Sequence, residues 1–143
     1  MSIFGDIAAV FGETKRINRT SNNENALNEN ERVWLDNLRK AADSGDIGAM
    51  FDLGVLYYQG KYVGYNPDMA CRYWEAAAKR GHVSSMYNLG LLYMGDVSTY
   101  YFDDNKAGEW LSLAAKNGDK DAARILNERF RYSKWSDKWR LTK

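Results

Sequence analysis

The feature that most constrains the fold is a stretch that the chain contains twice. Residues 49–60 read AMFDLGVLYYQG and residues 85–96 read SMYNLGLLYMGD. In this alignment Leu53 falls on Leu89 and Gly54 on Gly90, 36 positions further on. A period of about 20 to 50 residues is typical of proteins that stack copies of one supersecondary unit. We therefore expect a repeat protein of the solenoid type, whatever the local propensities suggest.

A second repeated motif supports the same period. The motif Ala-Ala-x-x-Gly begins at Ala41, Ala77 and Ala114, with spacings of 36 and 37 residues. Between these landmarks, apolar residues recur at steps of three and four, which is the period of one helix face. We therefore expect an all-α fold of antiparallel helix hairpins. The predicted helices cover about 31–43, 47–59, 67–79, 83–94, 104–116 and 120–132.

Local signals within the two copies agree with this assignment. Asn66 is a good N-cap and Pro67 suits the first helical position, and Asp103 takes the capping place in the second copy. A glycine inside a helix costs roughly 1 kcal/mol. Because Gly54 and Gly90 recur at one place in both copies, we expect each of them to let a neighbouring helix approach closely.

Four segments are expected along the chain. Residues 1–12 form an amphipathic helix, 13–30 a polar linker, 31–132 the repeat domain and 133–143 a C-terminal capping segment. Trp135 and Trp139 are four positions apart, which predicts a short closing helix over the end of the repeats. The N-terminal helix either caps or docks on the repeats, or binds a partner or a membrane surface.

The repeated residues resemble a known family. The first copy has the pattern Ala49-x3-Leu53-Gly54-x2-Tyr57-x2-Gly60-x2-Val63-x2-Asn66-x3-Ala70-x3-Trp74-x2-Ala77-Ala78-x2-Gly81. This pattern resembles the Sel1-like repeat, a relative of the tetratricopeptide repeat. It departs from the family at Tyr62, where glycine is usual, at Asn66, where aspartate is usual, and in the second copy at Ser85, where alanine is usual. The resemblance implies a right-handed α-solenoid that binds other proteins as an adaptor or scaffold, mostly in bacteria.

The tetratricopeptide resemblance also implies which residues line a concave groove. These lie two before, two after and five after the leucine of Leu-Gly. They are Phe51, Val55 and Tyr58 in the first copy, Tyr87, Leu91 and Met94 in the second, and Arg124, Glu128 and Arg131 in the third. We expect the first six to form an apolar floor for a protein or peptide partner, with Arg124 and Arg131 as orienting charges. Alternatively, the N-terminal helix or linker fills the groove.

Nothing in the sequence favours catalysis, a cofactor or a metal. His82 is the only histidine and Cys71 the only cysteine, and no metal-ligand spacing or phosphate-binding glycine loop is present. We expect His82 to be a solvated loop residue and Cys71 a small core or boundary residue. A non-enzymatic protein is predicted, either an adaptor or a neutralising partner of a toxin or effector. Aromatic residues at the loop edge are a second candidate surface, or else pack on helix ends: Tyr62, Tyr65, Tyr100, Tyr101 and Phe102.

Charge and composition limit the remaining functions. A net charge of +1 argues against a general polyanion binder. No apolar run approaches the roughly 20 residues that span a bilayer, no secretory signal is visible and one cysteine needs no oxidising compartment, so we expect a cytoplasmic protein. Residues 124–143 nevertheless hold seven Lys or Arg against two acids. This basic segment is either a solvated cap or contacts an acidic partner, and the alternative function is a nucleic-acid-associated or enzymatic role through it.

Overall fold

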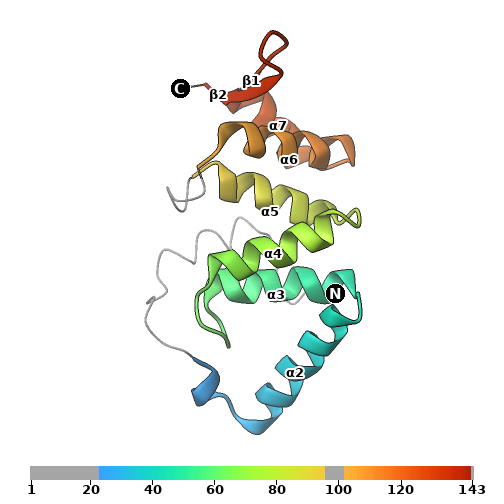
Figure 1. The fold of residues 1–143 in the computed structure, drawn as a ribbon, viewed down its shortest axis with the longest axis vertical. Coiled ribbons are helices and arrows are strands. Elements are labelled where there is room, and N and C mark those ends of the chain that lie inside the picture. The colour runs from blue at the N-terminus through green and yellow to red at the C-terminus, as the bar shows by residue number, and fades with distance from the viewer. Residues whose placement is uncertain (1–22, 96–101, 143) are drawn as a thin grey trace. The chain divides into compact units, whose positions relative to one another are not determined.

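The computed structural model describes residues 23–95 and 102–142. The predicted N-terminal helix at 1–12 and residues 13–22 of the predicted linker lie outside this part. The chain divides into two compact units, one ending at Arg80 and the other beginning at Gly81. Each unit contains helices that pair as antiparallel hairpins (Figure 1). The prediction of an all-α helical-repeat fold is confirmed, with one small sheet at the C-terminal end.

The described part of the first unit, from residue 23 on, consists of a short 3-10 helix and three α-helices. They are η2 (Asn23–Ala26), α2 (Glu29–Asp43), α3 (Ile47–Gln59) and α4 (Pro67–Ala78). Helix α4 has the predicted start, because the Asn66 side chain accepts a hydrogen bond from the Met69 amide and Pro67 is the first residue of the helix. Helix α3 begins in the same way at Asp46, whose carboxylate accepts from the Ala49 amide at 2.8 Å.

The predicted linker is too long at its C-terminal end. Helix α2 begins at Glu29 because Asn28 and Glu31 form a capping box, in which each side chain accepts a hydrogen bond from the other residue's amide at 2.9 Å. Upstream of this cap, Glu24 accepts a hydrogen bond from the Arg39 guanidinium at 2.8 Å. Residues 23–30 therefore belong to the folded unit rather than to a linker.

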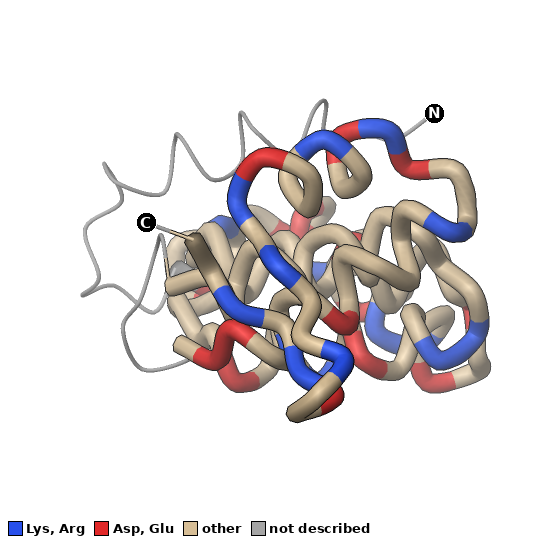
Figure 2. Tube along the Cα trace, turned by 90° about the horizontal axis from the view of Figure 1, so that it is seen from above, with Lys and Arg blue, Asp and Glu red and all other residues tan. Residues whose placement is uncertain are grey.

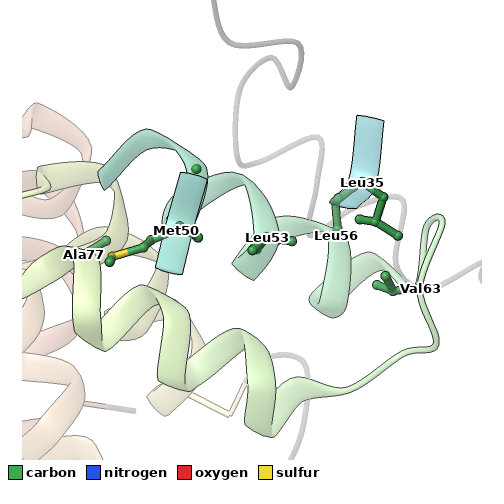
Figure 3. Packing of buried hydrophobic residues seen from close by; sticks show 8 residues of the cluster. Leu35, Met50, Leu53, Leu56, Val63 and Ala77 are labelled. Carbon is green, nitrogen blue, oxygen red and sulfur yellow. The ribbon is translucent and has the colours of Figure 1, made fainter. Parts of the chain in front are cut away.

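The core of the first unit is formed where α2, α3 and α4 meet. Figure 3 shows the buried side chains of this cluster, among them Leu35, Met50, Leu53, Leu56, Val63 and Ala77. A Cβ built at Gly54 would overlap the indole of the fully buried Trp74 on α4. The predicted role of Gly54 in close helix packing is therefore confirmed.

The second unit repeats this design and then departs from it. It contains α5 (Val83–Tyr93), α6 (Asp104–Lys116) and α7 (Lys120–Arg129), followed by β1 (Phe130–Ser133) and β2 (Lys138–Leu141). Asp103 caps α6 as predicted, by accepting from the Lys106 amide at 3.0 Å. Gly90 packs against Leu111, which would lie 2.5 Å from a Cβ at that position. The second copy therefore uses its helical glycine as the first copy does.

The secondary structure predicted for residues 130–141 is wrong. Helix α7 stops at Arg129 instead of Tyr132, and the predicted closing helix is an antiparallel β-hairpin with Phe130 opposite Leu141 and Tyr132 opposite Trp139. Asp137 has a φ of 52°, a left-handed conformation that ends the connection between the strands. Strand β2 packs on α6, where Trp139 lies against Gly108, and β1 contacts β2 and α7. Apolar residues alternate along both strands, and here this period prevails over the four-residue spacing of the two tryptophans.

Candidate protein-binding surface

Helix α5 and its C-cap residue carry three of the predicted groove residues on one stripe. Tyr87, Leu91 and Met94 follow each other at steps of four and three, which places them on the same side of the helix. Tyr87 and Leu91 are half-buried, whereas Met94, just after the helix, is buried. The face marked by Gly90 packs on α6, through Leu111. Two apolar side chains of α5 thus keep part of their surface open.

The corresponding stripe of α3 is part of the interior. Phe51 is 8% exposed, and Val55 and Tyr58 are 0% exposed. The ring of Tyr58 lies 5.4 Å from that of Trp74 and 6.2 Å from that of Tyr65, between centroids. The Trp74 indole also donates a hydrogen bond to the Phe51 carbonyl at 3.3 Å. Of the six expected floor residues, only Tyr87 and Leu91 therefore offer surface in this structure.

The charged residues expected at the far end of the groove are separated by the end of α7. Arg124 lies on α7 and pairs with Asp121 at 3.3 Å and with Glu128 at 3.5 Å. Arg131 lies on β1 instead of on the helix, and its guanidinium donates to the carbonyls of Asn127 and Phe130. The prediction that Arg131 continues the helical register of Arg124 is therefore wrong. The charge of Arg124 is also balanced locally by two carboxylates.

The loop-edge aromatics that the structure describes differ in exposure. Tyr62 is half-buried and its ring packs edge-on against Trp34, with centroids 5.4 Å apart. Tyr65 packs on Tyr58, whereas Phe102 is largely exposed. Tyr100 and Tyr101 lie outside the described residues. Tyr62 and Tyr65 therefore follow the alternative in which loop aromatics pack on helix ends.

His82 has a structural role that the sequence analysis missed. It is half-buried and caps α5, because its Nδ1 accepts a hydrogen bond from the Ser85 amide at 3.3 Å and lies 2.9 Å from the Ser85 hydroxyl. Burial lowers the pKa of His82. The prediction of a solvated loop residue is thus wrong, and the informative signal was the same capping position that Asp46 occupies before α3. Ser85 is fully buried, so this pair offers no accessible nucleophile.

The remaining described side chains that could take part in catalysis or metal binding are buried or do not cluster. Cys71 is buried, as predicted, with its sulfur 3.7 Å from a Glu75 carboxylate oxygen. Within residues 23–95 and 102–142, no three His, Cys, Asp or Glu side chains form a group that could hold a metal ion. No helix in that same part of the chain is both long and apolar enough to cross a membrane.

The C-terminal hairpin creates a surface that the prediction of a closing helix could not reveal. A shallow depression of about 650 Å³ lies between α6 and the hairpin. It is lined by Glu109, Ser112, Leu113, Lys116, Tyr132, Asp137 and Trp139. The alternation of aromatic and charged residues at 130–132 and 138–141 was the available signal for these strands.

Comparison with known proteins agrees with this geometry. The family model described as Sel1 repeat matches residues 47–82 and again residues 83–119. A Sel1 repeat protein from Oxalobacter formigenes, whose crystal structure is known, is 32% identical and superposes with a TM-score of 0.56. That match covers 64% of this chain and 68% of the other chain.

A second solved structure is more distant. It is c5321, a protective antigen present in uropathogenic Escherichia coli strains and displaying an SLR fold, with 25% identity and a TM-score of 0.56. The match covers 86% of this chain but only 26% of that protein. No curated protein matches the chain. The two matched segments coincide with the hairpins α3–α4 and α5–α6, and they account for half of the sequence: the chain belongs to the Sel1 repeat family.

Proposed function

We propose that this chain is a non-enzymatic adaptor or scaffold that binds a protein or peptide through the first helices of its repeats. Sel1 repeats are generally protein–protein interaction modules. A neutralising partner of a toxin or effector would work through the same kind of contact. Within the second unit, the contact helix is α5, and the partner binds to Tyr87 and Leu91 of its apolar stripe, next to the buried Met94.

The observation that carries this proposal is the composition of α5. Its sequence VSSMYNLGLLY contains no charged residue. A helix at the surface of a protein normally has charged or polar residues on its outer face. In α5, Tyr87 and Leu91 occupy partly open positions instead. Partly exposed aromatic and aliphatic side chains of this kind are favoured at protein interfaces.

The other predicted groove residues can contact the partner only under certain conditions, which follow from their burial or their ion pairs. Phe51, Val55 and Tyr58 form the equivalent stripe of α3 and bind a partner only where it gains access to them. Arg124 is exposed but paired with Asp121 and Glu128, so it orients a partner only by exchanging one of these ion pairs. Exposed pairs are worth about 0–1 kcal/mol, so such an exchange is feasible.

An affinity capture tests the proposal. The wild type is compared with a Tyr87→Glu, Leu91→Glu double variant, using extract from the source organism and quantitative mass spectrometry. The matched control is Leu113→Glu, which places the same charge on an apolar side chain of α6 that is 40% exposed. Circular dichroism first establishes that all three proteins are folded.

The expected result is one or more proteins retained by the wild type and by the Leu113→Glu control, but lost with the double variant. A purified candidate should then bind the wild type with an affinity that changes little with salt, because apolar burial is insensitive to screening. Equal retention by the double variant would show that α5 does not bind the partner.

A further inference from the structure

The two faces of the C-terminal hairpin have different surroundings. Tyr132 and Trp139 lie opposite each other with ring centroids 5.1 Å apart, and Trp139 packs against Gly108 of α6. Strand β2 is tied to the same helix, because the amides of Trp139 and Leu141 donate to the side chains of Asn105 at 2.9 Å and Asp104 at 3.2 Å. One face is therefore fixed on α6.

Because side chains alternate along a strand, the next residues point to the other face. This face carries Arg131 opposite Arg140 and Ser133 opposite Lys138. Like charges at directly opposite positions of an antiparallel pair are destabilising. Two arginines at such a pair therefore lower the stability of the hairpin, although the Arg131 guanidinium also donates to the carbonyls of Asn127 and Phe130.

In the described part of the chain, no acid forms an ion pair with the basic residues of the hairpin. Among residues 23–95 and 102–142, no carboxylate lies within ion-pair distance of Arg131, Lys134, Lys138 or Arg140. The one acid of the hairpin, Asp137, instead accepts a hydrogen bond from the Tyr132 hydroxyl. Figure 2 shows the basic residues along the two strands, which lie nearest the viewer. We call Arg131, Lys138 and Arg140 of the strands, together with Lys134 of the connecting turn, the basic face.

Trp135 adds an apolar group beside these charges. It lies in the connection between β1 and β2 and is fully exposed. An exposed indole leaves a large apolar area in water, and tryptophan and arginine are the residues that most often dominate the energy of protein interfaces. The basic face and Trp135 together provide charge recognition and one apolar anchor.

We propose that the basic face and Trp135 form a second interaction surface, which binds an acidic segment of a protein that also supplies an apolar side chain to the indole. The arginine guanidinium is a planar fork that matches a carboxylate with two parallel hydrogen bonds. This surface lies outside the two matched repeats and does not depend on the apolar stripe of α5.

The geometry favours an acidic protein segment over single-stranded nucleic acid. Surfaces for single strands stack successive bases on several aromatic rings. In the described part of the chain, only Trp135 is a fully exposed aromatic residue. Tyr132 is 45% exposed, but its ring packs on Trp139, and both line the depression beside α6. Outside residues 124–143, acids outnumber basic residues by 17 to 13. A long polyanion would therefore meet net negative charge beyond the hairpin, whereas a short acidic segment would not.

Fluorescence anisotropy with the full chain tests this assignment. The probe is a labelled glutamate-rich peptide with one phenylalanine, compared with the same peptide carrying glutamine in place of glutamate and with a labelled oligothymidylate. The protein variants are Arg140→Glu and Trp135→Ser, and the matched control is Lys79→Glu, an exposed lysine of the first unit. Thermal unfolding is measured for every variant.

We expect the acidic peptide to bind, with weaker binding at higher salt, and the glutamine peptide to bind at least tenfold more weakly. Arg140→Glu should weaken the binding of the acidic peptide about tenfold. The same substitution should raise the Tm, because it places a carboxylate opposite Arg131. Trp135→Ser should also weaken binding, while Lys79→Glu and the Tyr87→Glu, Leu91→Glu variant should bind like the wild type. This last comparison separates the surface from the stripe on α5.

Three results would overturn the assignment. They are the absence of saturable binding of the acidic peptide by the wild type, equal binding by Arg140→Glu, and tighter binding of the oligothymidylate with the same dependence on Arg140 and Trp135. The third would identify the surface as a nucleic-acid site instead. A lower Tm of Arg140→Glu would contradict the premise that the opposed arginines cost stability.

Discussion

Gly108 of α6 lies directly against Trp139 of β2. A Cβ at this position would overlap the Cβ and Cγ of Trp139. The same indole packs edge-on against Phe130, with centroids 6.4 Å apart, so one tryptophan connects both strands to the helix. The β-hairpin thereby packs on α6, the second helix of the second matched repeat, through β2.

The first prediction concerns this contact. Gly108→Ala should lower the free energy of unfolding by about 1–3 kcal/mol, because Trp139 must move although alanine favours the helix intrinsically. Urea denaturation gives the magnitude, and amide exchange of Trp139 and Leu141 shows whether the hairpin has come away from α6. Gly48→Ala on α3 is the control, since Gly48 is exposed and its nearest atom is an Asp46 oxygen at 3.3 Å. Equal unfolding energies for Gly108→Ala and wild type would contradict the packing role.

The second prediction concerns Gly54, which occupies the same place in the first copy as Gly90 does in the second. Gly54→Ala should cost about 1–3 kcal/mol, because its methyl group meets the indole of Trp74. Trp74→Leu alone should also destabilise, since Trp74 is fully buried and donates to the Phe51 carbonyl. The double variant should lose less unfolding free energy than the two single variants lose together, because the smaller leucine makes room for the methyl group. Strictly additive losses in urea denaturation would refute this contact.

The repeat fold was predictable because its determinants are local and written twice. The caps at Asn66 and Asp103 act on amides a few positions away. The effect of Gly54 and Gly90 is set by the next helix along the chain. Two copies in one register make each assignment support the other. The helix start at Asn28 was not predicted, because the capping box that Asn28 forms with Glu31 precedes a half repeat and has no second copy to support it.

The hairpin and the exposure of the groove residues were not predictable for a different reason. Trp135 and Trp139 have helical spacing, whereas the residues at 130–132 and 138–141 alternate, so the sequence contains both periods. The long-range contact of Trp139 with Gly108 favours the strands. Likewise, the sequence places Val55 and Leu91 at equivalent positions of their stripes, but burial depends on what packs around each one. Val55 is fully buried, in a stripe whose Tyr58 packs against Trp74 and Tyr65, whereas Leu91 keeps part of its surface.

The third prediction concerns a difference between the two copies. Asp52 of α3 stands where the second copy has Asn88, and partial burial, together with repulsion from Asp46, raises the pKa of Asp52. A raised carboxyl pKa means that ionisation opposes folding, so stability falls as pH rises through this pKa. Asp52→Asn should therefore stabilise the protein at pH 7 by about 0.5 kcal/mol.

This gain should disappear below about pH 4, where the wild-type carboxyl is itself protonated. Asp36→Asn is the control, because Asp36 is exposed on α2 and 3.8 Å from Arg39, and it should change the stability little. Thermal unfolding across pH measures both variants. A destabilised Asp52→Asn protein at pH 7 would contradict the stated cause of the pKa shift.

The fourth prediction concerns the cap of α5. Nδ1 of His82 accepts the Ser85 amide proton, so protonation of the ring would turn this acceptor into a donor and break the cap. Burial also lowers the pKa of His82 below its ordinary value. As the pH falls below about 6.5, the unfolded chain takes up a proton that the folded chain resists. The cap's contribution to stability is therefore complete above this pH and is lost below it.

Two variants isolate this effect. His82→Asn keeps a good capping acceptor, so its stability near pH 7.5 should lie within about 0.5 kcal/mol of the wild type, and its stability should fall less between pH 7 and 5. His82→Ala removes the acceptor and should lose about 1 kcal/mol near pH 7.5. Urea denaturation at several pH values compares the three proteins. If wild type and His82→Asn lost stability in parallel as the pH fell, titration of His82 would not be coupled to the capping of α5.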